Sequence, residues 1–153
     1  MPQLTYTEAE ERGAPGLIAK CGHGHGKSLA NEDAATIPFG KAVKLGTNLE
    51  EQFALVDGAA GEVFAGILSC QFVQQDYDAV GAAQYEVAKI LRHGEIWVTV
   101  QSAVQPGDPV FYLNTGVNAG DFGSAGDVDI SANAAWCSVA GVGELAKLEI
   151  NLP

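Results

Sequence analysis

The residues with the most obvious chemical potential lie in one short stretch, CGHGHGKS, at residues 21–28. Its final Gly-Lys-Ser is similar to the end of a phosphate-binding loop, but that loop has glycine where Cys21 stands and continues into a helix that completes the anion site. Pro38 follows Ser28 after ten residues, which leaves little room for such a helix. The stretch therefore gives little support to nucleotide binding or to hydrolysis that depends on Lys27.

The same stretch also contains possible metal ligands. Cys21, His23 and His25 occupy alternate positions, so an extended backbone would project all three side chains to one side. A structural zinc site takes four such ligands, and the neighbouring sequence supplies neither a fourth ligand nor a second pair at ligand spacing. Zinc remains an alternative, but a polar loop is the simpler interpretation, and neither a metal nor a cofactor is predicted.

Other candidates for chemistry are isolated. Asp121, Asp127 and Asp129 surround a Gly-rich segment, yet they lack the alternating oxygen ligands and terminal Glu of a calcium loop. Ser124 lies in FGSAG, where a nucleophile elbow would have glycine two residues before the serine. No acid–base pair can be assembled from spacing alone, so the sequence predicts that the protein is not an enzyme.

Length and composition favour a single domain with one hydrophobic core. The chain has 153 residues, of which 47% are hydrophobic, and a chain of this size buries enough surface to fold without metals or disulfides. Its apolar runs fall far short of the roughly 20 residues of a membrane helix, and its N-terminus has no secretory signal. The three scattered cysteines are expected to be small buried hydrophobes in a protein made in a cytoplasm.

The charge balance argues against direct binding to nucleic acid. The chain has 8 basic and 19 acidic residues, a formal net charge of −11. Proteins that bind nucleic acid gain much of their affinity by neutralising phosphates with Lys and Arg. If this protein works near DNA, we expect another component to lie between them.

The elements that would position these residues are short strands. From Ile37 onward, apolar runs recur every ten to fifteen residues between Gly-containing turns, which is typical of an all-β sandwich or barrel. We predict a mainly β fold, a compact β-barrel or β-sandwich with little helix. Residues 1–33 are polar and interrupted by glycine, and we predict that they form an extended, loop-rich N-terminal arm ordered on contact, followed by one β domain at residues 34–153.

The stretch from Gln84 to Leu113 organises this domain. Ile96, Val98 and Val100 alternate with polar residues, as expected of a half-buried strand. We predict tight turns at His93–Gly94 and at Pro106–Gly107, the second of type II, and a strand rather than a helix over residues 82–91. The C-terminal segment alternates in the same way through Leu148, Ile150 and Leu152, and residues 116–126 are expected to form a long surface loop.

The two tryptophans call for different interpretations. Trp136 is expected in the core. Trp97 lies on the polar face of its strand, so either the sheet is covered on both sides or the ring anchors a contact with another chain. One alternative function follows from the second case, a small β-barrel module that binds a carbohydrate or peptide, in which exposed aromatics such as Trp97 and Tyr112 line a groove.

Four segments in order resemble the capsid structural cement, or head decoration, proteins of tailed bacteriophages. They are IPFGKAV (37–43), EVFAGI (62–67), YEVAKILRHGEIWVTVQSAVQPGDPVFY (85–112) and AAWCSVAGVGELAKLEINLP (134–153). The segments cover most of residues 37–153, whereas the preceding arm matches poorly.

The resemblance implies a non-enzymatic virion protein, synthesised in the host cytoplasm, that binds the outer surface of an assembled capsid. Its implied partners are the major capsid protein and other copies of itself, as a dimer or trimer, with no contact to nucleic acid or membrane. The arm and exposed aromatics are the expected contact regions, and the residues predicted at interchain interfaces are Tyr6, Leu17, Ile18, Trp97 and Phe122. Deletion of residues 2–26 is expected to leave the β domain folded and to abolish capsid decoration.

Overall fold

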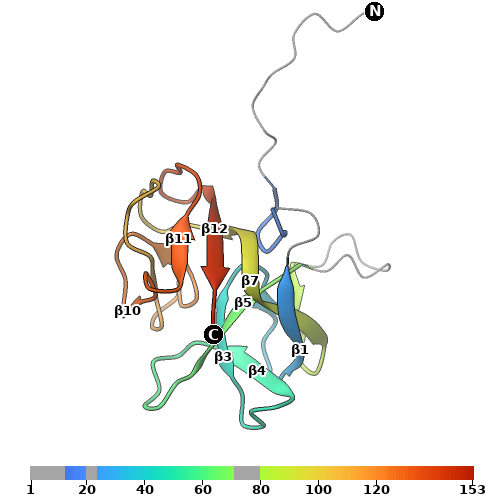
Figure 1. The fold of residues 1–153 in the computed structure, drawn as a ribbon. Coiled ribbons are helices and arrows are strands. Elements are labelled where there is room, and N and C mark those ends of the chain that lie inside the picture. The colour runs from blue at the N-terminus through green and yellow to red at the C-terminus, as the bar shows by residue number, and fades with distance from the viewer. Residues whose placement is uncertain (1–12, 20–23, 71–79) are drawn as a thin grey trace, which may run out of the picture.

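The structure, a computed structural model, describes residues 13–19, 24–70 and 80–153. Every regular element in these ranges is a β-strand, which confirms the predicted mainly β fold (Figure 1). The described part of the chain contains no helix long and apolar enough to cross a membrane.

Five strands close into a barrel. The ring runs through β1 (His25–Asn31), β4 (Gln52–Leu55), β3 (Ala42–Leu45), β5 (Phe64–Leu68) and β7 (Val87–Thr99), and β7 pairs with β1 to complete it. The β1–β4 pair is parallel, and the other neighbours in the ring are antiparallel. Closure removes the open edges that these strands would otherwise present to other chains.

Two of the remaining strands extend the sheet beyond the barrel, and the other five form two small sheets. The sheet continues from β7 to β12 (Leu145–Asn151) and ends at β11 (Ala134–Trp136). A three-stranded sheet consists of β10 (Val128–Asp129), β8 (Phe111–Tyr112) and β9 (Phe122–Gly123), and a two-stranded sheet pairs β2 (Ile37–Pro38) with β6 (Gly81–Ala82). In Figure 1, β10, β11 and β12 lie on one side of β7 and β1 lies on the other.

The long strand β7 corrects one sequence prediction. A tight turn was expected at His93–Gly94, but β7 passes through both residues without reversing. Gly94 has a φ of 132°, a backbone conformation that favours glycine, and it pairs with Ile150 of β12. A bulge opposite His25 displaces the register with β1. These two irregularities bend the strand. Its first half pairs with β1 and β5 in the barrel, and its second half pairs with β12.

The alternating patterns mark the core correctly. Ile96, Val98 and Val100 are completely buried. Leu148 is also completely buried, and Ile150 is 1% exposed. One apolar cluster fills the barrel between β1, β3, β4, β5 and β7. A second lies between the β7–β12–β11 part of the sheet and the three-stranded sheet, and it contains Trp136, as predicted. The predicted strand over residues 82–91 is also confirmed in its second half, which belongs to β7.

Two loop predictions have different outcomes. At Pro106–Gly107 the chain makes a β-turn, because Asp108 N donates to Gln105 O at 3.1 Å and Gly107 has a φ of 100°. Residues 116–126 do not form an uninterrupted surface loop, because they contain β9. Phe122, at the start of β9, is completely buried.

The predicted arm overlaps the barrel. Its last part, His25–Asn31, is β1, which pairs with β4 and β7. The division into an arm and a β domain stays a prediction, and any arm separate from the barrel has to end before residue 25.

Candidate functional site

The best-defined candidate for a contact site is a segment that docks on β7. Residues 13–19, called here the docking segment, lie along the second half of this strand. Gly16 N donates to Trp97 O at 2.7 Å, Trp97 N donates to Leu17 O at 2.9 Å and Ala19 N donates to Glu95 O at 2.8 Å. Ile18 also forms an antiparallel bridge with Ile96. The docking segment therefore occupies the edge of β7 in the manner of an added strand.

The docking segment resolves the alternatives for Trp97. The indole is only 7% exposed, and a Cβ on Gly13 would lie 2.4 Å from its Cδ1, so only glycine fits against this edge of the ring. The Nζ atom of Lys147, on β12, lies 5.2 Å from the ring centroid, within the range of a cation–π interaction. The sheet is thus covered on its second side, and the chain itself covers the ring that was a candidate contact with another chain.

A close approach of two backbones holds the docking segment in place. Gly16 has a φ of 79°, and a Cβ at this position would lie 2.8 Å from the Gly40 nitrogen. Its carbonyl oxygen accepts a hydrogen bond from Cys70 N at 2.7 Å. The positive φ and the close approach to Gly40 both favour glycine, because a side chain would be strained by this φ and would collide with the neighbouring segment of the chain.

The other predicted contact residues separate into three groups. Leu17 and Ile18 are half-buried in the docking segment, and Ile18 packs against the core. Phe122 is a correction, because it is completely buried in the core of its own chain and presents no surface to another. Tyr6 lies outside the described residues. The role of Tyr6, Leu17 and Ile18 between chains stays a prediction.

The CGHGHGKS stretch at residues 21–28 lies only partly within the described residues. Cys21 and His23 lie outside the described residues. Residues 26–28 belong to β1, which continues as a strand to Asn31, so the helix that a phosphate-binding loop requires does not follow Ser28. The described residues of this stretch therefore do not form the loop-to-helix geometry of a phosphate-binding loop.

The isolated acidic and hydroxyl groups are held by local partners. Ser124 Oγ donates to Ala103 O at 3.0 Å. The three aspartates of the Gly-rich region each have their own contact: Asp121 with Lys41 Nζ at 2.6 Å, Asp127 with Asn114 N at 3.0 Å, and Asp129 with Ser131 Oγ at 2.6 Å. Neither a nucleophile elbow nor a calcium loop is formed by these residues.

The cysteines depart from the expectation that all are buried. Cys70 is half-buried, and Cys137 is exposed. The Cys137 thiol and the carboxylates of Glu95 and Glu149 lie within 4.8 Å of one another. Partial burial raises the pKa of the Cys137 thiol, and the two carboxylates raise it further, since both effects disfavour the thiolate.

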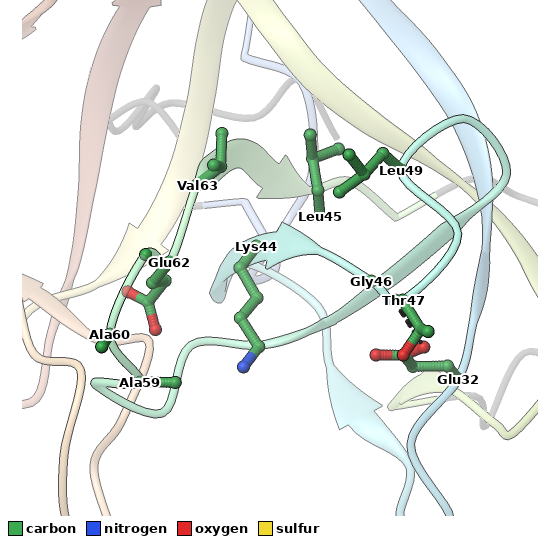
Figure 2. Close-up of a pocket in the computed structure, with 11 residues that line it drawn as sticks. Glu32, Lys44, Leu45, Gly46, Thr47, Leu49, Ala59, Ala60, Glu62 and Val63 are labelled. Atoms are coloured by element: carbon green, nitrogen blue, oxygen red, sulfur yellow. Dashed lines mark hydrogen bonds between the residues drawn. The ribbon is translucent and has the colours of Figure 1, made fainter.

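A shallow pocket of about 270 Å³ lies between the loops that follow β3 and β4 (Figure 2). Leu45, Leu49 and Val63 line one part of it. Its acidic groups are engaged, because Glu32 Oε2 accepts from Thr47 N at 2.9 Å and Glu62 Oε2 accepts from Asp57 N at 2.9 Å. These hydrogen bonds shape the two loops rather than form a pair for acid–base chemistry.

The groove required by the carbohydrate or peptide alternative is not built from the aromatics that suggested it. Tyr112 is 2% exposed and stacks on Phe64 with ring centroids 5.0 Å apart. Burial raises its pKa well above the usual range, and the nearby Glu62 carboxylate adds to this.

Two residues of the docking segment, Gly13 and Gly16, were not singled out from the sequence. Their roles depend on contacts with residues far along the chain.

Comparison with known proteins supplies the family. Residues 2–151 match the family described as structural cement protein (E217 gp24/Pam3 gp6). No curated protein matches the chain. A chain from the capsid of Myoviridae phage XM1 has a similar fold, with a TM-score of 0.70 and 16% sequence identity over 97% of this chain and 98% of that one. The family match spans nearly the whole chain, and this protein therefore belongs to the phage structural cement protein family.

Proposed function

We propose that this protein binds the outer surface of an assembled phage capsid and stabilises contacts between capsomers of the major capsid protein. The observation that carries the proposal is the match to the structural cement family over residues 2–151. A protein that binds only the assembled shell stabilises that shell by mass action. No chemical step is needed, in keeping with a non-enzymatic virion component.

The charge of the chain supports the outer surface as the place of binding. A net charge of −11 would be repelled by packaged DNA but is compatible with a surface that the shell separates from it. Association of two or three copies would join several weak contacts and raise the overall avidity. The partners we propose are therefore the major capsid protein and other copies of this chain.

We propose that the residues before the docking segment extend these contacts. The described attachment to the barrel begins at Gly13, which packs on Trp97, and twelve residues precede it. An extended segment can add a strand to the sheet of a neighbour through main-chain hydrogen bonds. Deletion of residues 2–26, suggested by the sequence, would also remove the docking segment and the start of β1, so deletion of residues 2–12 is the sharper test.

The test is reconstitution on capsids that lack the protein. Purified protein is added to expanded capsids of the phage that encodes it and to unassembled major capsid protein, and binding is measured by co-sedimentation and electron microscopy. We expect saturable binding to the outside of capsids only, with a higher temperature of capsid disruption. Equal binding to unassembled subunits, or binding without stabilisation, would contradict the proposed role. Full decoration by the protein lacking residues 2–12 would contradict only the role of those residues.

A further inference from the structure

We propose that His25 and His93 form a binding site for a divalent transition-metal ion such as Zn²⁺. The two histidines are paired residues on neighbouring antiparallel strands, His25 at the start of β1 and His93 within β7. Directly paired residues project to the same face of a sheet, with Cβ atoms about 4.5–5.5 Å apart. This proximity is created by the fold, because 68 positions separate the two residues in the sequence.

The geometry suits two imidazoles on one metal ion. Zn–N bonds of about 2.0–2.1 Å place two nitrogens about 3.3 Å apart in a tetrahedral site. Rings that start from paired Cβ atoms can reach this separation. His25 is exposed and His93 is half-buried at the surface, so water can fill the remaining coordination positions. Imidazole favours zinc, copper and nickel over magnesium, which prefers oxygen ligands.

A second residue fixes the state of the His93 ring. Its Nδ1 atom lies 2.6 Å from Asn151 Oδ1, and Asn151 is also paired with His93 across the sheet. An amide oxygen only accepts hydrogen bonds, so Nδ1 is the donor of this pair, and in the neutral ring Nε2 is the nitrogen with the free lone pair. Metal-binding histidines commonly have their second nitrogen oriented in this way. Asn151 is therefore a positioning residue for the proposed site.

Two nearby cations are engaged by main-chain carbonyl oxygens. The Lys89 Nζ atom donates to Gly24 O at 2.6 Å, and Arg92 Nη2 donates to Pro153 O at 2.6 Å. A metal held by His25 and His93 would join the start of β1 to β7 at the bulge between them. The ion would bind the folded protein and not the separated strands, so it would stabilise the native state.

The test measures thermal unfolding of the full-length protein with zinc chloride, with magnesium chloride as control. We expect zinc in large excess over its Kd to raise Tm by about 5 °C, and magnesium to have no effect. His25→Gln and His93→Gln should each remove the shift while keeping the Tm measured in EDTA. Asn151→Ala should weaken zinc binding about tenfold, measured by calorimetry.

A variant with both Cys21→Ser and His23→Gln separates this site from one formed within residues 21–25. The proposal expects this variant to keep the zinc shift, because His25 and His93 are intact. Loss of the shift in this variant together with its retention in His93→Gln would overturn the proposal in favour of a local site. Absence of any zinc shift in the unmodified protein would also overturn it.

Discussion

Trp97 is the single residue on which the docking segment most depends. Its ring is nearly buried between Gly13 and Lys147. We expect Trp97→Ala to lower the free energy of unfolding by about 3–4 kcal/mol, because a large buried aromatic is lost and a cavity remains. Urea denaturation measures the change. Val117→Ala is the control, since Val117 is 98% exposed and should change stability by less than about 0.5 kcal/mol. Equal stability of the two variants would contradict this role for the indole.

Gly16 offers a second test at the scale of single residues, with Gly107 as a matched control. Both have positive φ, but a Cβ at Gly107 meets nothing within 4 Å, whereas one at Gly16 lies 2.7 Å from Phe39 Cβ. We expect Gly107→Ala to cost about 1 kcal/mol from backbone strain alone. Gly16→Ala should cost about 1–3 kcal/mol more through the collision. If urea unfolding gives the same loss for both, the close packing of the docking segment is wrong.

The chemistry of Cys137 provides a test that depends on pH. Partial burial and the carboxylates of Glu95 and Glu149 raise the pKa of its thiol, so less thiolate is present at a given pH and alkylation is slow. In a background with Cys21 and Cys70 replaced by serine, Glu149→Gln should lower this pKa and speed reaction with iodoacetamide at pH 8. Lys147→Gln should act in the opposite direction, because the lysine lowers the pKa. A rate unchanged by Glu149→Gln would contradict the electrostatic contribution.

At the scale of elements, the docking segment acts as an additional strand on β7. Its described contacts with Trp97 begin at Gly13, so deletion of residues 2–12 keeps them all, and deletion of residues 2–19 removes them. We expect the longer deletion alone to lower the urea midpoint and to shift tryptophan emission to longer wavelength, because Trp97 becomes hydrated. Trp136, the other tryptophan, is buried elsewhere in the core. Identical spectra for the two deletions would mean that the segment does not cover the ring.

For the whole molecule, the net charge and the proposed avidity each give one prediction. With a net charge of −11, the protein should leave duplex DNA unshifted in a gel at physiological salt. Light scattering should give a mass of two or three times 15.9 kDa, the proposed homo-oligomer. A monomer at capsid-binding concentrations would contradict the avidity argument, and a DNA shift that decreases with salt would contradict the outer-surface assignment.

Local alternation was enough to predict much of the fold. Ile96, Val98 and Val100 face the core because side chains alternate along a strand, and the pattern reports this without knowledge of the partner strand. The turn at Pro106–Gly107 also depends on local geometry. The turn expected at Gly94 was wrong, since a glycine with positive φ can bend a strand as well as reverse it, and neighbouring strands determine which occurs.

The contacts of the candidate site were harder to predict from the sequence than the fold. Trp97 was singled out because a large aromatic stood on a polar face, but its cover comes from Gly13, a residue 84 positions earlier. Phe122 was assigned to a loop surface because glycines surround it, whereas its pairing with Tyr112 and its burial place it in the core. Glycine-rich sequence does not distinguish a surface loop from a backbone packed closely against another strand.

The β class, the faces that enter the core and the acidic character of the surface can be predicted from the amino-acid sequence, because they depend on residue type and on a period of two. Three further features require the folded chain: β7 is one bent strand, residues 13–19 cover Trp97, and His25 lies opposite His93. Each of these is a contact between residues far apart in the chain. Such contacts follow from strand register, which is set by the packing of the whole barrel and not by any local pattern.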